Sequence, residues 1–436
     1  EQAKALITGY CRNYLRNHVA KGKNKDTVTQ VLSKRFDIPA SWLANAFDKD
    51  VIRKDSITDA NKNLVLQDFA TYQYRPNSRV VILDACFNGS FHLDDCIADE
   101  YIFSDGKTID CIANSVNVLQ DKWYDRYIGL LGLGAYVGNI ARFSGYLESH
   151  CIGDPTFAFT PAVKMEDINE LLASTNPKLW QRYLSENVEP DLRSMAMARL
   201  AESGQLSSSQ LLNIFRTSTS ALVRLQALEL LADKRDDNFI EAIKLGVDDS
   251  YELVQRFAIN FIGKSGDERL VPILIHKSIS NNTSERCNFS LMNAMTMYKK
   301  DVLMNEFEKQ FDNPDVKYIN KAEVRAAIAK AINSNAGKWT EYMENIVGSD
   351  TPTKRRLSSI RTSRNYCPPY YIPQMMAYIE ASNDADVQVA LFESLGWRRY
   401  SYMAPTIAAF AKACSEDSKY PEKVRDEALK TYNRLK

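Results

Sequence analysis

The chain has 436 residues, and its 55 lysines and arginines are balanced by 55 aspartates and glutamates. That length exceeds what one ordinary hydrophobic core organises, so we expect two domains, or one domain joined to a repeat array. The zero formal charge argues against a dedicated nucleic-acid or membrane-surface binder, because both need clustered positive charge. No run of about 18 apolar residues predicts a transmembrane segment.

The first third of the chain alternates between helical and strand-like patterns. Residues 5–19 follow helical spacing, Asp26 is placed to cap a second helix through Phe36, and Pro39 suits the start of a third. A fourth helix is predicted over residues 61–72. Strands are predicted at 79–85 and 108–113, with a helical segment between them at about 97–103, and the apolar stretch 127–143 reads as one buried helix. This order implies a parallel sheet with helices on its faces.

A repeat replaces the strands after about residue 165. The segment LVRLQALELLA (222–232) is echoed 31 positions later by LVQRFAINFIG (253–263), and looser echoes start at Glu323, Asp386 and Lys423. Repeated apolar-faced helices at this spacing are typical of an α-solenoid of HEAT type, and the alternative is a non-repetitive helical bundle. The basic run KRRLSSIRTSR (354–364) suits either an acidic partner or a solvated face of the solenoid.

Cys86 lies in the stretch RVVILDACFNGSFH (79–92), which is unlike its surroundings. The apolar run 80–83 and the Asn-Gly turn signal predict a buried strand that ends near Gly89. A cysteine at the carboxyl end of such a strand is placed where ligands meet an α/β sheet, and Ala85, Asn88 and Gly89 near it are small or flexible. The alternative is an inert buried thiol, as most cysteines are. The other seven cysteines form no CxxC pair or Cys/His cluster, so neither zinc nor a disulfide scaffold is indicated.

Three segments in order resemble the gingipain family of cysteine peptidases, which has a caspase-like fold. VVILDACFNGSF resembles the nucleophile strand, TIDCIANSVNVLQDKW the next core strand and substrate-side loop, and SGYLESHCIGDPTFAF the closing segment. The sequence departs from the Gln-Ala-Cys-x-Gly pattern of caspases, because Asp84 replaces the glutamine and one residue is inserted before Gly89.

The resemblance implies an α/β fold with a partial caspase-like parallel sheet, followed by an all-α HEAT-like solenoid. Residues 1–78 would be a helical insertion or linker before the nucleophile strand, 79–164 the C-terminal part of a gingipain-like catalytic domain, and 165–436 the solenoid. It further implies an exported bacterial protein, periplasmic, cell-surface or secreted, although the first residues carry no signal peptide.

Cys86 is the nucleophile that the resemblance implies, and the turn from Cys86 to Gly89 would shape the oxyanion site. Asn114, Ser115, Asn117 and Trp123 fall in the loop that forms one wall of the specificity pocket in this family. The alternative is an ordinary polar loop with Trp123 packed inside. The best-known members cut after Arg or Lys, but no residue of this sequence identifies the acid that this preference requires, and Asp84 and Asp121 are only guesses for it.

The catalytic histidine of the family precedes the nucleophile strand and is followed by glycine. Residues 1–78 contain only His18, in the first amphipathic helix, where a surface or packing role fits better. His92, His150 and His276 have no motif support. We therefore expect the base on a segment of the same protein before Glu1, and we expect this chain alone to be inactive, because a thiol needs a base to cleave peptides at useful rates.

The sequence thus predicts a cysteine endopeptidase that acts on protein or peptide substrates, with no nucleic-acid partner. The alternative function is a degenerate peptidase fold that serves as a scaffold for a protein-binding solenoid. No organic cofactor or catalytic metal is indicated. Calcium stays open through the family resemblance, but two adjacent acids on a turn, Asp94 and Asp95, are more typical of solvated or capping residues.

Overall fold

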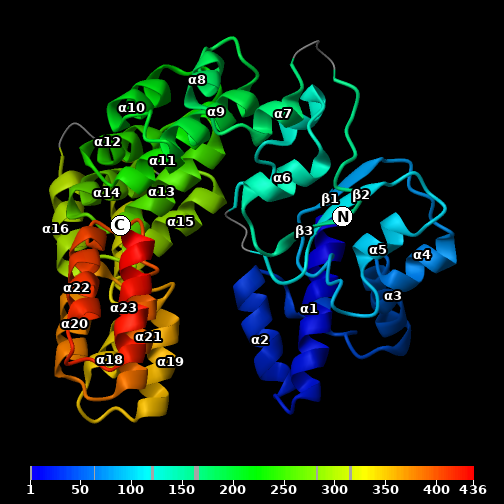
Figure 1. Cartoon of the computed structure of the whole chain (residues 1–436). Helices are drawn as coiled ribbons and strands as arrows, with labels where there is room; N and C mark the ends of the chain where they lie inside the picture. The colour runs from blue at the N-terminus through cyan, green and yellow to red at the C-terminus, as the bar shows by residue number, and fades with distance from the viewer. Residues whose placement is uncertain (1, 63, 119–121, 162–165, 281–282, 314–316) are drawn as a thin grey trace. The chain divides into compact units, whose positions relative to one another are not determined.

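The structure is a computed structural model that describes residues 2–62, 64–118, 122–161, 166–280, 283–313 and 317–436 (Figure 1). The chain divides into two compact units. The sheet unit comprises Glu1–Val118 and Gly145–Phe157, and the helical unit comprises Leu119–Ser144 and Ala158–Lys436. The candidate nucleophile Cys86 belongs to the sheet unit.

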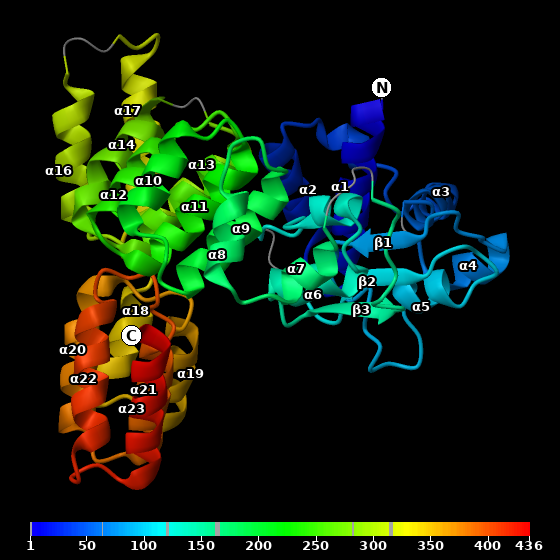
Figure 2. The ribbon, with the colours of Figure 1, turned by 45° about the horizontal axis from the view of Figure 1, so that its top comes forward.

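A small mixed sheet of three strands forms the centre of the sheet unit (Figure 2). Its order is β1 (Val80–Leu83), β2 (Asp110–Asn114), β3 (Ser149–Gly153). β1 and β2 are parallel, with Val80 opposite Asp110, and they are separated in sequence by α5 (Ile97–Ile102). The predicted strand–helix–strand unit is therefore confirmed. β2 is buried along its whole length, as expected of a central strand.

β3 is a strand that the sequence pattern does not predict. It runs antiparallel to β2, with His150 opposite Ala113, and makes the sheet mixed where a parallel sheet was expected. Its residues are half-buried except for the exposed Gly153, so no alternation marks them as a strand. Gly153 has φ 129° and lies so close to Ile109 that a Cβ would fall 2.3 Å from the Ile109 carbonyl oxygen. Pairing with β2, rather than local propensity, specifies this strand.

The remaining helices of the sheet unit precede β1. They are α1 (Gln2–Ala20), α2 (Lys25–Phe36), η1 (Ala40–Leu43), α3 (Lys49–Ala60) and α4 (Leu66–Tyr72). The first two match the predicted helices, the Pro39 signal opens only a short 3-10 turn, and the helix predicted over 61–72 starts at Leu66. α3 was not predicted, although Asp48 caps it by accepting from the Asp50 and Val51 amides. A small apolar core holds α1, α2 and η1 together.

The apolar stretch 127–143 is not one helix, as the sequence predicts. It forms a 3-10 helix η2 (Ile128–Leu133) and a separate α6 (Val137–Ser144). Gly134 ends η2 in the left-handed region at φ 85°, and its amide donates to Leu131. A residue with this backbone conformation cannot continue an α-helix, so the prediction of a single helix is wrong.

The helical unit continues with an array of paired helices. After α7 (Ile168–Ala173), α8 (Pro177–Trp180) and η3 (Gln181–Tyr183) come α9 (Pro190–Glu202), α10 (Ser208–Thr217), α11 (Ala221–Lys234), α12 (Asp237–Gly246), α13 (Glu252–Ser265), η4 (Glu268–Leu270), α14 (Val271–Ser280), α15 (Glu285–Met295), α16 (Lys300–Phe311) and α17 (Lys321–Asn335). α9, α11 and α13 start 31 residues apart, as predicted from the repeat.

The array is built by stacking equivalent helices. α11 packs between α9 and α13, α13 contacts α15, and α15 contacts α17, while α10 lies against α12 and α14 against α16 (Figure 1). Helices approach closely where a glycine permits it, since a Cβ on Gly246 would lie 2.9 Å from the Ala258 Cβ. The structure therefore shows a repetitive helical architecture in this unit.

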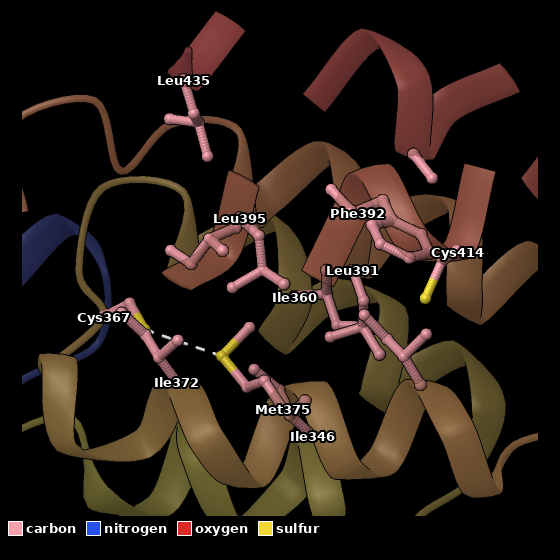
Figure 3. Close-up of a cluster of buried hydrophobic side chains, with 14 of the residues drawn as sticks. Ile346, Ile360, Cys367, Ile372, Met375, Leu391, Phe392, Leu395, Cys414 and Leu435 are labelled. Carbon is pink, nitrogen blue, oxygen red and sulfur yellow. Dashed lines mark hydrogen bonds between the residues drawn. The ribbon is translucent and has the colours of Figure 1, made fainter. Parts of the chain in front are cut away.

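A bundle of helices follows the array. It contains α18 (Thr340–Val347), α19 (Thr353–Ser363), η5 (Pro369–Tyr371), α20 (Ile372–Ala381), α21 (Ala385–Leu395), α22 (Ala404–Glu416) and α23 (Glu422–Leu435). Its core gathers apolar side chains from all of these helices (Figure 3). In Figure 3 the Cys367 thiol points to the Met375 sulfur at 3.6 Å. The basic run on α19 is not uniformly solvated, because buried Arg356 donates to the Ile346, Gly348 and Thr351 carbonyls.

Candidate active site

Cys86 lies on the turn that follows β1, at the carboxyl end of the strand. It is the exposed member of the eight cysteines. Its sulfur accepts a hydrogen bond from the Val118 amide at 3.3 Å, which fixes the side chain against the segment after β2. The next residue, Phe87, has φ 61°, a left-handed conformation that is unusual for a bulky side chain. The turn is sharp, and it presents the thiol to solvent.

Backbone hydrogen bonds tie this turn to the end of β2. The Gly89 amide donates to the Asn114 carbonyl at 2.9 Å, and the Phe87 amide donates to the Val116 carbonyl at 3.3 Å. Gly89 is required because a Cβ there would lie 2.7 Å from the Ala113 Cβ and 2.9 Å from its carbonyl carbon. The Gly89 amide is thus occupied by the protein. Within the described residues, the Cys86 amide donates to no acceptor.

Asn114 connects all three strands through its side chain. The amide nitrogen donates to the Leu83 carbonyl at 3.2 Å and to the Ala85 carbonyl at 3.3 Å, and the amide oxygen accepts from the Ser149 hydroxyl at 2.7 Å. The residue has no exposed surface. We assign Asn114 to positioning the Cys86 turn, a role that sequence reasoning, which proposed a substrate contact, did not find.

Ser115 and His150 form a second polar contact at the same edge. The Ser115 hydroxyl lies 2.8 Å from the His150 Nε2, and the Ser90 hydroxyl donates to the Ser115 carbonyl at 3.0 Å. The Phe91 ring meets the His150 ring edge-to-face, with centroids 4.7 Å apart. Ser115 is buried and His150 half-buried. His150, which had no motif support, is therefore the histidine that the fold holds beside the end of β2.

The other predicted substrate contacts lie in different surroundings. Asn117 is exposed. Trp123 belongs to the helical unit, where its side chain is fully buried and the Arg126 guanidinium stacks over the ring at 5.0 Å. Asp84 is exposed, and Asp121 lies outside the described residues. We retain Asn117 as a candidate substrate contact.

The structure places no imidazole in hydrogen-bond contact with Cys86 among the residues it describes. His18 lies in the last turn of α1, where its ring stacks on Tyr14 at 3.9 Å and its Nδ1 lies 3.0 Å from the Tyr14 carbonyl. His92 is exposed beside Phe91, and His276 is on α14 of the helical unit. None of these histidine contacts provides a general base for Cys86.

The seven other cysteines have chemistry unlike that of Cys86. Burial raises the pKa of each of their thiols, and it raises the pKa of Cys111 to about 12. Cys151 donates to the buried Asp110 carboxylate at 2.7 Å, and burial raises the pKa of Asp110 to about 6. Raised thiol pKa values and low accessibility disfavour nucleophilic roles at these positions.

Metal and membrane sites find no support in the described part of the chain. No group of three or more His, Cys, Asp or Glu residues converges there to hold a metal ion, and Asp94 and Asp95 are both exposed. No described helix combines the length and the apolar character that crossing a bilayer requires.

Comparisons with known proteins do not identify a family or a function for this site. No family model matches the sequence, and no curated protein matches it. Among solved structures, human deoxyhypusine hydroxylase in complex with glycerol is similar at 15% sequence identity, over 59% of this chain and 83% of that chain, with a TM-score of 0.23. At that TM-score the likeness supports no inference about this chain.

Proposed function

We propose that the turn after β1 is the nucleophile site of a cysteine endopeptidase with a gingipain-like, caspase-like fold, joined to a HEAT-type solenoid. The observation that carries the proposal is an exposed thiol, Cys86, fixed at the carboxyl end of a strand. The resemblance of residues 79–160 to gingipain-type motifs supports the same assignment. Phe87 and Phe91, 52% and 55% exposed, add apolar surface next to it in sequence for a peptide substrate.

In the proposed chemistry the Cys86 thiolate attacks a scissile peptide carbonyl to form a thioester, and the peptide C–N bond breaks as the amine leaves with a proton from the general base. Water then hydrolyses the thioester and restores the thiol. The Cys86 amide, which donates to no acceptor among the described residues, would hold the oxyanion. Losing one such donor costs on the order of 3 kcal/mol of barrier, or about a hundredfold in rate. The general base is proposed to be a histidine on a segment of the protein outside residues 1–436, since His18 is engaged with Tyr14. From the family resemblance we also propose that the protein is exported by a bacterium.

A non-catalytic scaffold is the second candidate function. Its support is that no described histidine contacts Cys86, while the helical unit presents a long stacked array of the kind that binds protein partners. In that case the tightly bonded turn at Cys86 would be a structural remnant of a peptidase fold.

Peptidyl acyloxymethyl ketones separate the two functions, because they alkylate a catalytic thiolate that a base and an oxyanion site have activated. The reagent panel would vary the residue at the cleavage position and would be applied to a chain extended before Glu1. The endopeptidase predicts rapid labelling at Cys86, lost in Cys86→Ala and kept in the control Cys414→Ala. Equal slow labelling of the wild type and of Cys86→Ala would overturn the proposal and favour the scaffold.

A further inference from the structure

Large apolar side chains are exposed on both segments that adjoin Cys86. Phe87, Phe91 and Leu93 follow the cysteine on the turn after β1, and they are 52%, 55% and 59% exposed. Val116, on the segment after β2, is 47% exposed. Single exposed apolar residues are normal on a protein surface, whereas several gathered beside a reactive group indicate a binding surface.

Hydrogen bonds hold the two apolar segments together at the thiol. The Phe87 amide donates to the Val116 carbonyl at 3.3 Å, and the Val118 amide donates to the Cys86 sulfur at 3.3 Å. Consecutive Cα atoms lie about 3.8 Å apart, so both Phe87 and the segment of Val116 are close to the sulfur. A substrate held at Cys86 therefore meets apolar side chains from both segments.

Phe87 is a costly residue for its position in the turn. Its φ of 61° lies in the left-handed region, which glycine and asparagine adopt with less strain. The ring is more than half exposed, and none of the aromatic ring pairs in the described part of the chain includes it. Packing within the fold thus does not account for a phenylalanine here. Strained residues of this kind cluster at functional sites, which fits a ring that contacts a substrate.

Phe91 is exposed and yet held in place. Its ring meets the His150 ring edge-to-face, with centroids 4.7 Å apart, and its amide donates to the Gly89 carbonyl at 2.8 Å. The His150 Nε2 in turn lies 2.8 Å from the Ser115 hydroxyl, at the end of β2. An aromatic side chain that is already ordered loses little conformational entropy when a ligand covers it.

The acids of the same turn are not arranged to select a cation. Asp84 is exposed and already has an interaction within the protein, and Asp94 and Asp95 are exposed beyond Leu93. Exposed carboxylates stay hydrated, so pairing with a cation there contributes little free energy. The surface around Cys86 therefore favours burial of an apolar side chain over pairing with an arginine or a lysine.

We propose that this surface selects peptide substrates with an aromatic or large aliphatic side chain at the residue whose carbonyl Cys86 attacks. Phe87 and Phe91 determine the preference, and Leu93 and Val116 extend the apolar surface. The inference rests on the proposed peptidase function, because a thiol that acts on peptides makes its neighbours substrate contacts. It departs from the Arg or Lys preference of the best-known members of the family that the sequence resembles.

Two substituted iodoacetamides test the preference on the chain of residues 1–436, since alkylation needs no general base. One reagent carries a phenylethyl group and the other a guanidinoethyl group. The labelling rate of Cys86 with each is divided by its rate with unsubstituted iodoacetamide, and glutathione gives the intrinsic ratio of the two reagents. We expect the preference of Cys86 for the phenylethyl reagent to exceed that of glutathione at least about tenfold.

Variants assign the preference to the two rings. Phe87→Asn keeps a residue that tolerates the left-handed backbone, and Phe91→Ala removes the second ring; each is expected to reduce the preference about threefold or more. Phe103→Ala is the matched control, because Phe103 is 82% exposed at the end of α5 in the same unit. It should keep the wild-type preference. Circular dichroism melting verifies that each variant is folded.

A guanidinoethyl reagent that labels Cys86 as fast as the phenylethyl reagent would overturn the inference, and so would full preference in both Phe87→Asn and Phe91→Ala. The acyloxymethyl ketone panel separates this failure from failure of the proposed function. Rapid labelling by the Arg and Lys reagents alone keeps the peptidase and overturns the apolar preference. Labelling of Cys86 by none of the panel overturns the peptidase function, and the substrate class with it.

Discussion

Alkylation of the native chain is expected to modify Cys86 far ahead of every other cysteine. The thiolate is the reactive form, so the rate depends on how much of each thiol is ionised and on access to it. Burial raises the pKa of Cys111 to about 12, which leaves about one thiolate in ten thousand at about pH 8. An unperturbed thiol in solvent is about one-quarter thiolate at that pH. Relative to a free cysteine in water, ionisation alone therefore slows alkylation of Cys111 on the order of a thousandfold.

Access adds to this difference, because Cys11, Cys111 and Cys287 have no exposed surface and react only when the structure opens locally. The assay is limited treatment with iodoacetamide, followed by quenching, proteolysis and mass spectrometry of the cysteine peptides. In concentrated guanidinium chloride all eight sites should react at similar rates, which controls for peptide recovery. If Cys111 or Cys287 keeps pace with Cys86 in the native chain, the assignment of Cys86 as the accessible thiol is wrong.

Three further predictions concern the Cys86 turn and the sheet that carries it. Gly89→Ala places a methyl group 2.7 Å from the Ala113 Cβ, and is expected to lower the free energy of unfolding by about 1–3 kcal/mol in chemical denaturation. Asn114→Ala removes a buried amide that hydrogen-bonds to Leu83, Ala85 and Ser149, and should lower the free energy of unfolding by about 2–3 kcal/mol and alter the alkylation rate of Cys86. Burial raises the pKa of Asp110 to about 6, whereas an unfolded-chain aspartate titrates near about 4. Between these values Asp110 is ionised in the unfolded state only, so the free energy of unfolding falls as pH rises from about 4 to about 6, by up to about 3 kcal/mol. Asp110→Asn should remove that pH dependence.

Matched controls separate these effects from general damage. Gly132→Ala introduces a methyl group into open space and should be close to neutral. Asn117→Ala removes an exposed amide, and Asp94→Asn an exposed carboxylate, so neither should reproduce the stability loss of Asn114→Ala or the pH effect of Asp110→Asn. If Gly132→Ala lowers stability as much as Gly89→Ala, the packing argument is wrong. If Asn117→Ala lowers stability as much as Asn114→Ala, the hydrogen-bond argument is wrong. A pH dependence unchanged in Asp110→Asn would contradict the buried-carboxyl argument.

The elements that sequence reasoning found are those specified by local pattern. α9, α11 and α13 repeat every 31 residues because each presents the same apolar stripe to its neighbours. The β1 and β2 strands are short apolar runs, and their parallel pairing follows from the helix between them. α3 was missed although the Asp48 cap marks its start, because little apolar periodicity accompanies the cap.

The features that sequence reasoning did not find depend on contacts between distant residues. β3 forms because the edge of β2 is available to pair with it. Within the helical unit, the Tyr402 amide donates to the Ser265 carbonyl, which joins the end of α13 to a segment more than a hundred residues later. The role of Asn114 could not be predicted from the sequence either, since its acceptors Leu83 and Ala85 lie about thirty positions upstream. A polar residue after a predicted strand is equally consistent with a substrate contact and with a buried hydrogen-bonding role.

The geometry of the Cys86 turn is therefore determined by β2 as much as by its own residues. The Gly89 amide donates to the last residue of β2 and the Phe87 amide donates to the backbone after it. Asn114 fixes the carbonyls of Leu83 and Ala85, and the Val118 amide orients the thiol. This arrangement sustains the left-handed Phe87 backbone, a conformation that persists only where the surroundings over-determine it. Substitutions at the end of β2 should thus change Cys86 reactivity without touching the cysteine, whereas exposed neighbours of the turn such as His92 should leave it unchanged.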